Sequence, residues 1–527
     1  MNSTKLLPKS RVFFVFAATG FCMVQVLCQA QSNPHLSVTQ PGGMPGVPVM
    51  TGIERASNGV VLTWDGPSGY YQLFQKSRLE DTAWQPVGPR TNFSRTATVA
   101  GVGEKAFFRV SGPAAQFAGS STCAECHSSI HDWEANTAHA GALQTLEQIG
   151  MGSNPNCLPC HTVGFGLPSG YTNQIKTPHL AGVQCESCHG AAANHAANPQ
   201  DFTVKPRVEL AAEVCGGCHT GAQQPEFDEW KGTRHAVVTE DMNPSDRISS
   251  CGRCHSGSAR LSMIKHEPLP VGDANVAITC AVCHDPHQTN ANPAQVRNPL
   301  YSTKDYFLST SDVFTNKYDP QVNLCAQCHN HRGATWQGTS RPPHHSPQYN
   351  VMLGTVGELE SGVAPNDPAA HAFLSKQCVT CHMQTQEYVS EEQPEVTGHS
   401  FAVETFGTCS GCHPQPEQLV EFTQESVSLR IEEVKEALDL WGTTKAPEAL
   451  RVKYGKIAWE YTTIGGLSSG GPGPSSSEQA LIPDNIKKAR FDLYLVLHDG
   501  SFGVHNGPYA IRLLDTAMEW VRAELDQ

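Results

Sequence analysis

One five-residue pattern, Cys-x-x-Cys-His, recurs nine times in this chain and constrains it more than any other feature. The nine cysteine pairs are Cys123/Cys126, Cys157/Cys160, Cys185/Cys188, Cys215/Cys218, Cys251/Cys254, Cys280/Cys283, Cys325/Cys328, Cys378/Cys381 and Cys409/Cys412. The histidines that follow them are His127, His161, His189, His219, His255, His284, His329, His382 and His413. Among the 20 cysteines, those outside the pattern are Cys22 and Cys28, both near the N-terminus. One chemistry used nine times has to explain this spacing.

Cys-x-x-Cys-His is the attachment signature of c-type haem. Each thiol adds across one vinyl group of the porphyrin, and the adjacent histidine becomes an axial ligand of the iron. Structural zinc also uses Cys-x-x-Cys pairs, but it does not need a histidine after every second cysteine. Disulfides, which are common in exported proteins, would not keep nine pairs at one spacing. We therefore predict nine covalently attached haem c groups, which supply the core that the glycine- and proline-rich middle section lacks.

The nine motifs fall into three sets of three with similar internal spacing, beginning at Cys123, Cys215 and Cys325. Between the first two motifs of the first two sets lie the related phrases DWEANTAHA at 132–140 and EWKGTRHA at 229–236. The third set is looser there. Duplication explains this pattern economically, so we predict a three-haem unit used three times.

The 24 histidines exceed the nine that end motifs, and the surplus recurs at matched places around the motifs. The spacing favours nine of them as distal iron ligands, namely His139, His179, His235, His266, His287, His345, His371, His399 and His505. The reserves are His131, His195, His331, His344 and His498. A methionine ligand would raise the potential, but with so many imidazoles we expect mostly bis-histidine, low-potential haems.

The first thirty residues have the pattern of an export signal. Lys5, Lys9 and Arg11 form a basic start, an apolar run follows over residues 12–27, and Ala30 then precedes polar sequence. The run is shorter than the roughly twenty residues that a membrane span needs. We predict a signal peptide over 1–30 and a linker over 31–48. A retained anchor and a lipid on Cys28 stay open as alternatives, and no later segment is apolar enough to span a bilayer.

Residues 49–113 read as a small β-sandwich. Runs of β-branched and aromatic residues at 60–64, 70–74, 96–99 and 107–110 are separated by Gly, Pro and Asn turns. The segment resembles the fibronectin type III-like modules of exported bacterial proteins.

The last segment, 415–527, reads as helical. Apolar residues recur at helical spacing, with Val427, Ile431, Val434, Leu438 and Trp441 in one stripe and Ile511, Leu514, Met518, Val521 and Leu525 in another. The fold class predicted for the chain is thus a mostly α and irregular multihaem cytochrome c core over 119–414, preceded by a small β-sandwich and closed by C-terminal helices.

Several phrases carry a resemblance to a known group. They are GSSTCAECH at 119–127, CLPCHTVGF at 157–165, GVQCESCHG at 182–190, CAVCHDPH at 280–287, PHHSP at 343–347, QCVTCHM at 377–383, TGHSF at 397–401 and DGSFGVHN at 499–506. These phrases resemble the multihaem cytochromes related to cytochrome c-554, hydroxylamine oxidoreductase and the pentahaem nitrite reductases. The resemblance implies closely packed haems in parallel and perpendicular pairs, C-terminal helices that support oligomers, and His505 as a distal ligand.

One departure from that group bears on activity. Its nitrite and tetrathionate reductases typically bind the catalytic haem through a motif ending in lysine, whereas all nine motifs here end in histidine. That argues against those reductase activities, but not against a hydroxylamine-oxidising type of site, which has an ordinary motif and an open distal face.

The sequence therefore favours an exported, periplasmic or cell-surface cytochrome that carries electrons between redox partner proteins, such as other cytochromes or a membrane quinol-linked complex. A net charge of −14 and a pI near 5.9 favour basic partners and exclude a nucleic-acid partner, which would need clustered Lys and Arg. The alternative is an oxidoreductase on a small nitrogen or sulfur compound at one haem with an open distal face. A third interpretation, an extracellular conductive or adhesive component, rests on the sandwich.

Overall fold

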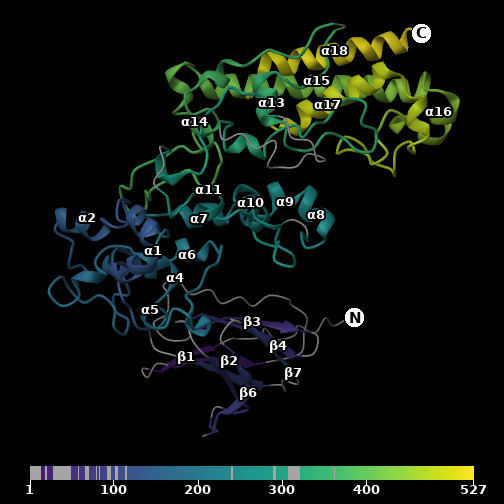
Figure 1. Cartoon of the computed structure of the whole chain (residues 1–527). Helices are drawn as coiled ribbons and strands as arrows, with labels where there is room; N and C mark the ends of the chain where they lie inside the picture. The colour runs from purple at the N-terminus through teal and green to yellow at the C-terminus, as the bar shows by residue number, and fades with distance from the viewer. Residues whose placement is uncertain are drawn as a thin grey trace, which may run out of the picture. The chain divides into compact units, whose positions relative to one another are not determined.

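The computed structural model of the chain divides into two compact units, which are residues 1–228 with 285–291, and residues 229–284 with 292–527 (Figure 1). It describes residues 13–17, 21–27, 49–56, 59–65, 71–78, 80, 81, 83–91, 96–100, 105–112, 115–238, 241–288, 292–306, 321–360 and 362–527. The first unit holds the first four motifs, and the second holds the other five. The division falls inside the predicted haem segment 119–414 and does not follow the predicted three-motif repeats.

Two antiparallel sheets form the N-terminal part of the first unit. One sheet has the strand order β1-β2-β8-β5-β6 and the other has the order β3-β4-β7. Their bounds are β1 Phe13–Ala17, β2 Phe21–Leu27, β3 Val49–Ala56, β4 Gly59–Asp65, β5 Tyr71–Lys76, β6 Gln85–Thr91, β7 Thr96–Ala100 and β8 Lys105–Ser111. The four predicted strands correspond to β4, β5, β7 and β8, which confirms them. Leu62, Trp64, Tyr71 and Phe108 are buried between the sheets, as expected for inward-facing positions of paired sheets.

The strands β3 and β6 were not predicted. Glycine and charged residues interrupt the apolar alternation in β3, and β6 carries Pro86 and Pro89. Proline is tolerated because β6 lies at an edge of its sheet, where a missing N–H costs no ladder hydrogen bond.

The segment predicted as a signal peptide contributes β1 and β2. The strand β2 pairs antiparallel with β8, with Val24 opposite Phe108. This pairing does not test whether the segment is removed, so the signal peptide stays a prediction. The predicted linker over 31–48 lies outside the described residues.

Short helices joined by turns carry the motifs. In the first unit they are α1 Ser120–Glu134, α2 Ala142–Gln148, α3 Leu158–His161, α4 Cys185–His189, α5 Ala193–Ala197 and α6 Glu213–Gly216, and α7 Glu226–Lys231 spans the boundary. In the second they are α8 Ser245–Ser250, α9 Gly252–His255, α10 Gly257–Ile264, α11 Cys280–Cys283, α13 Gln348–Leu353 and α14 Cys378–His382. The apolar clusters described among these helices are small, and the largest joins seven buried residues, among them Tyr306 and Tyr349.

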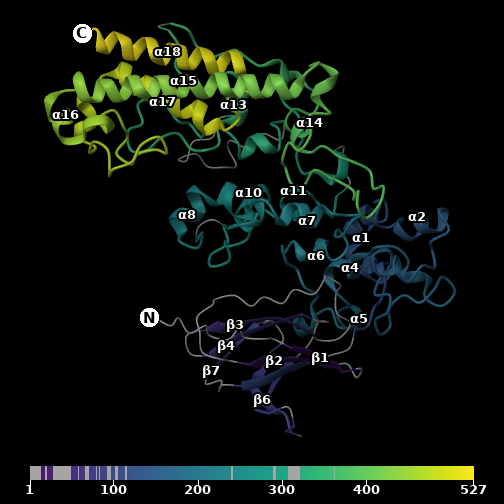
Figure 2. The same ribbon diagram turned by 180° about the vertical axis from the view of Figure 1, so that it is seen from behind.

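A helical bundle closes the second unit. It contains α15 Pro416–Thr444, α16 Glu448–Tyr454, α17 Asp484–Asp499 and α18 Gly507–Leu525. The long helices α15, α17 and α18 lie side by side, as both views show (Figures 1 and 2). The predicted α15 stripe is fully buried from Val427 to Trp441, and the predicted α18 stripe packs on the same core, which confirms both helices. No described helix is long and apolar enough to cross a membrane.

Candidate functional site

Each motif forms one tight turn of backbone. The helices α4 and α14 each contain a whole motif, and the first motif lies in α1, with a kink at His127. In the other six, the N–H of the motif histidine donates to the carbonyl of the first cysteine, at 2.8–3.2 Å. Positions i, i+3 and i+4 of such a turn share one face, so both thiols and the imidazole lie together. None of the eighteen motif cysteines, all of which the structure describes, is in a disulfide.

Two of the predicted haem-attaching cysteines differ from the other sixteen in their surroundings. Cys126 and Cys412, the second cysteines of the first and ninth motifs, are exposed, whereas the other sixteen are partly buried. The difference is local, because residues 126–129 of α1 and residues 410–412 of the last motif all face solvent. Cys126 and Cys412 stay predicted attachment residues, and the protein alone leaves both thiols uncovered.

Seven motif histidines each face a second imidazole ring. The ring centroids are 5.8 Å apart in His189/His287, 5.9 Å in His255/His344, 6.1 Å in His219/His139, and 6.2 Å in His329/His235, His284/His399, His413/His371 and His382/His505. Because a metal–imidazole bond is about 2 Å long, two imidazoles on opposite sides of one iron have centroids about 6 Å apart. The spacing therefore fits haem iron with two histidine ligands.

The Nδ1 atoms of several motif and spare histidines are held by hydrogen bonds. Backbone carbonyls accept from five of them, in the pairs His161/Ala142 at 2.7 Å, His189/Arg207 at 2.8 Å, His284/Ala294 at 2.7 Å, His382/Phe401 at 2.9 Å and His371/Val504 at 3.1 Å. An Nδ1–H donated to a carbonyl fixes the tautomer and leaves the Nε2 lone pair for a metal. The imidazoles are thus oriented as ligands by the protein itself.

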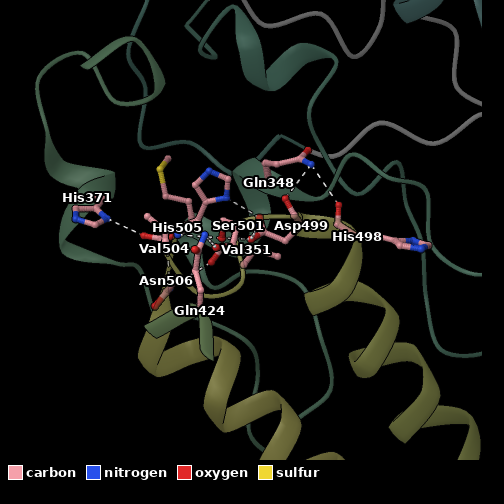
Figure 3. Close-up of polar contacts among 11 residues, drawn as sticks. Gln348, Val351, His371, Gln424, His498, Asp499, Ser501, Val504, His505 and Asn506 are labelled. Atoms are coloured by element: carbon pink, nitrogen blue, oxygen red, sulfur yellow. Dashed lines mark hydrogen bonds and ion pairs between the residues drawn. The ribbon is translucent and has the colours of Figure 1, made fainter. Parts of the chain in front are cut away.

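Side-chain oxygens hold Nδ1 in four further cases. Hydroxyl groups contact His344 from Ser346 at 3.1 Å and His399 from Thr397 at 3.0 Å. Carboxylates contact His505 from Asp499 at 2.7 Å, drawn in Figure 3, and His219 from Glu226 at 3.4 Å. His505 and His219 therefore differ from the other histidines of this set in having a negatively charged group next to Nδ1.

The structure brings six of the nine favoured spare histidines opposite a motif histidine, namely His139, His235, His287, His371, His399 and His505. At the fifth motif it brings the reserve His344 into that position, while the favoured His345 packs on His498 with centroids 3.7 Å apart. His266 lies exposed after α10, at a positive φ of 58°, and His179 lies beside Gly119. Among the described residues neither ring faces a motif histidine. The remaining reserves include His131, beside Asp132, and the buried His331.

Two motifs lack a facing pair of this spacing among the described residues. Beside the first motif, burial and then the nearby His127 lower the pKa of His195, whose Nδ1 atom is buried without a hydrogen-bond partner. At the second motif, no described imidazole ring lies opposite His161. Among the described residues, His161 thus has neither a facing ring nor a neighbouring imidazole like that beside His127.

Cysteine side chains of different motifs lie close enough to interact with one another. The contacts join Cys123 with Cys185, Cys160 with Cys218, Cys254 with Cys328, and Cys325 with Cys378. Haems attached at these sites would lie close to one another within each unit.

The chain is similar in sequence and fold to known proteins. The family described as "Cytochrome c554 and c-prime" matches residues 122–190. Cytochrome c-554 of Nitrosomonas europaea is 31% identical over 215 residues, which are 34% of this chain and 88% of that protein. The chain belongs to the cytochrome c-554 family.

This cytochrome c-554 family member is also similar to other multihaem cytochromes. The multiheme cytochrome MtrA of Shewanella baltica is 26% identical over 280 residues, which are 44% of this chain and 76% of MtrA. The crystal structure of the outer cell wall cytochrome OcwA matches with a TM-score of 0.50 and 19% identity, over 77% of this chain and 99% of that chain. That likeness shows the fold, which is a multihaem cytochrome core.

Sequence reasoning missed the groups that orient the histidines of this family member. Asp499 holds His505, and its position six residues earlier in the phrase at 499–506 is a sequence signal for this pairing. Glu229 holds the loop before His399, and nothing in its spacing marks it as a partner.

Proposed function

We propose that this chain is an exported nonahaem c-type cytochrome that carries electrons between redox partner proteins. Each motif would hold one haem through its two cysteines and its histidine. When bound, the haems supply the one-electron Fe(III)/Fe(II) couple. The observation that carries the proposal is the spacing of about 6 Å between seven motif histidines and a second imidazole.

The proposed distal ligands follow from that spacing. They are His195 for the first motif, His287 for the third, His139 for the fourth, His344 for the fifth, His399 for the sixth, His235 for the seventh, His505 for the eighth and His371 for the ninth. His195 rests on its closeness to His127, and the other seven rest on ring geometry.

The protein's role in transfer is to fix distances and orientations. The thiol contacts between motifs support hopping between neighbouring centres within each unit. Carbonyl and carboxylate partners on Nδ1 hold the ligand rings still, which limits reorganisation when an electron arrives. The acidic surface supports docking of basic partners.

The basic start and apolar run before residue 30 support export, to the periplasm or cell surface. A homo-oligomer through the C-terminal helices is supported by Leu419 and Phe422, which are exposed near the start of α15. The N-terminal sandwich would serve as a spacer or docking module.

The test is the mass and the electron paramagnetic resonance spectrum of the oxidised, purified protein. Nine added haems with low-spin ferric signals from at least eight of them are expected. A lower haem count, or several high-spin signals, would contradict the proposal.

A second candidate function rests on His161 alone. Since no described imidazole faces it, the second motif would hold a haem with an open distal face, suited to a small nitrogen or sulfur compound such as hydroxylamine. One high-spin ferric signal and binding of one carbon monoxide per reduced chain would support this function. Nine low-spin signals with no carbon monoxide binding would exclude it.

A further inference from the structure

The histidine His505 differs from the other candidate ligands in its hydrogen-bond partner. Its Nδ1 contacts Oδ1 of Asp499 at 2.7 Å, and the Asp499 side chain is only 2% exposed. The other carboxylate contact of this kind, between Glu226 and His219, is longer at 3.4 Å, and Glu226 is 26% exposed. The reserve His131 has a carboxylate still farther from its Nδ1, because Oδ1 of Asp132 lies at 3.8 Å and that side chain is 79% exposed. The remaining described Nδ1 partners are neutral carbonyls and hydroxyls. His505 is thus the candidate ligand with the closest and most buried negative charge.

The fold holds Asp499 rigidly in this position. It is the last residue of α17, and Gly500 after it takes a left-handed φ of 74° that turns the chain back. The Ser501 hydroxyl donates to Oδ2 of Asp499, and the Ser501 hydroxyl oxygen accepts from the N–H of His505 at 3.1 Å. Figure 3 shows these side chains converging within one short loop.

The far end of the loop is fixed as well. Asn506 caps α18 by accepting from the N–H of Tyr509, and its amide donates to the carbonyl of Asp367 at 2.8 Å. Among the described residues, no lysine or arginine side chain pairs with Asp499. The carboxylate therefore directs its charge towards Ser501 and His505.

We infer that Asp499 is a positioning residue that lowers the reduction potential of the haem held by the eighth motif. This inference rests on the proposed function, in which His505 and His382 are ligands of one iron. A carboxylate that accepts the Nδ1 proton makes the imidazole a stronger electron donor, which stabilises Fe(III) over Fe(II). A buried negative charge acts in the same direction, because reduction removes one positive charge from the iron centre.

This assignment has a consequence for the route of electrons. The eighth motif contacts the seventh through Cys378 and Cys325, and Cys381 interacts electrostatically with Cys409 of the ninth. The eighth motif lies between the seventh and the ninth in this series. Lowering the reduction potential of its haem makes transfer of an electron onto that haem less favourable. Asp499 would thereby slow passage between the seventh and ninth motifs without touching any iron.

The same loop provides an internal comparison. The carbonyl of Val504, the residue before His505, accepts from Nδ1 of His371, which faces the histidine of the ninth motif. Replacing the Asp499 carboxylate leaves this backbone contact in place. A change confined to one midpoint would therefore separate the carboxylate's effect from a general loosening of the loop.

The test is a redox titration, followed optically and by electron paramagnetic resonance, of the haem-loaded protein and of Asp499→Asn. We expect one midpoint potential to rise and one low-spin signal to change its g values, with the other signals unchanged. The matched control is Glu460→Gln, a fully buried carboxylate in the same unit that accepts from the Tyr494 hydroxyl at 2.5 Å. Unchanged midpoints in a fully loaded Asp499→Asn protein, or an equal shift in the control, would overturn the inference.

Should Asp499→Asn fail to load nine haems, Ser501→Ala keeps the inference testable. Removing the hydroxyl that donates to Asp499 leaves more of the charge on the His505 side, so the same midpoint should fall. No shift in Ser501→Ala would count against Asp499. If the unaltered protein itself lacks nine haems or is largely high-spin, the proposed function fails before either variant is read.

Discussion

At the scale of single residues, the partner of each imidazole matters as much as the imidazole. His344 and His345 are adjacent, yet only His344 faces the histidine of the fifth motif, at 5.9 Å between centroids. Its neighbour packs on His498, whose Nδ1 contacts the carbonyl of Pro343 at 2.7 Å. The local backbone direction therefore decides which of the two adjacent imidazoles faces the histidine of the fifth motif.

This difference predicts opposite outcomes for two alanine variants. His344→Ala should convert one low-spin ferric signal to high-spin and open one haem to carbon monoxide, because an axial ligand is lost. His345→Ala should keep the low-spin count of the unaltered protein. Electron paramagnetic resonance of both proteins checks this, and the reverse pattern would assign the ligand to His345.

A second prediction at this scale concerns Glu229. Its carboxylate accepts from the N–H of Thr397 at 2.9 Å, from the Thr397 hydroxyl at 2.8 Å and from the N–H of His399 at 2.6 Å. Hydrogen bonds to a charged acceptor are the stronger kind, so Glu229→Gln should destabilise the second unit by about 2 kcal/mol. The loss should appear as a lower midpoint of thermal unfolding at full haem content. Glu392→Gln, at an exposed carboxylate, is the control and should leave that midpoint in place.

At the scale of elements, the C-terminal helices pack by burying one apolar stripe each. Leu438 in α15 is fully buried in the cluster that α17 and α18 share, whereas Leu440, two residues later, is 50% exposed. A helix turns by about 100° per residue, so neighbouring leucines face the core and the solvent respectively. The burial of each leucine, and not its residue type, therefore sets its contribution to the free energy of unfolding.

Leucine-to-alanine changes at these two positions give a matched comparison. Leu438→Ala should lower the free energy of unfolding of the bundle by about 2–5 kcal/mol, because it removes buried contacts and leaves a cavity. Leu440→Ala should change it by about 0.5 kcal/mol or less, as is usual for surface positions. Denaturant unfolding followed by circular dichroism measures both, and equal effects would contradict the described packing.

At the scale of the whole molecule, the apolar core is unevenly distributed. The C-terminal bundle contains a large cluster that includes Trp441, Trp459 and Tyr494, while the described clusters among the motif-bearing segments are small. A segment with little apolar surface to bury cannot offset the entropy of ordering its backbone. Attached haems are the groups that would make up this difference.

Protein made without haem attachment should therefore fold only in part. We expect limited proteolysis to digest the motif-bearing segment over 119–414 and to spare a fragment that contains α15 to α18. Mass spectrometry of the fragments identifies them, with the haem-loaded protein as the control. Equal resistance of both regions in the haem-free protein would show that the motif segments have a sufficient core of their own.

The sequence by itself determined the haem attachment motifs, the family, four strands of the sandwich and the two stripes of the bundle. These features follow from local spacing, since a five-residue turn or a helical period is complete within a few positions of the chain. It could not choose His344 over His345, mark His161 as lacking a facing ring, or connect Asp499 with His505 and Glu229 with His399. The contacts of Glu229 join segments 168 and 170 residues apart. The other pairings depend on the direction in which a loop runs. Only tertiary packing brings those groups within bonding distance, which is why the structure decided them.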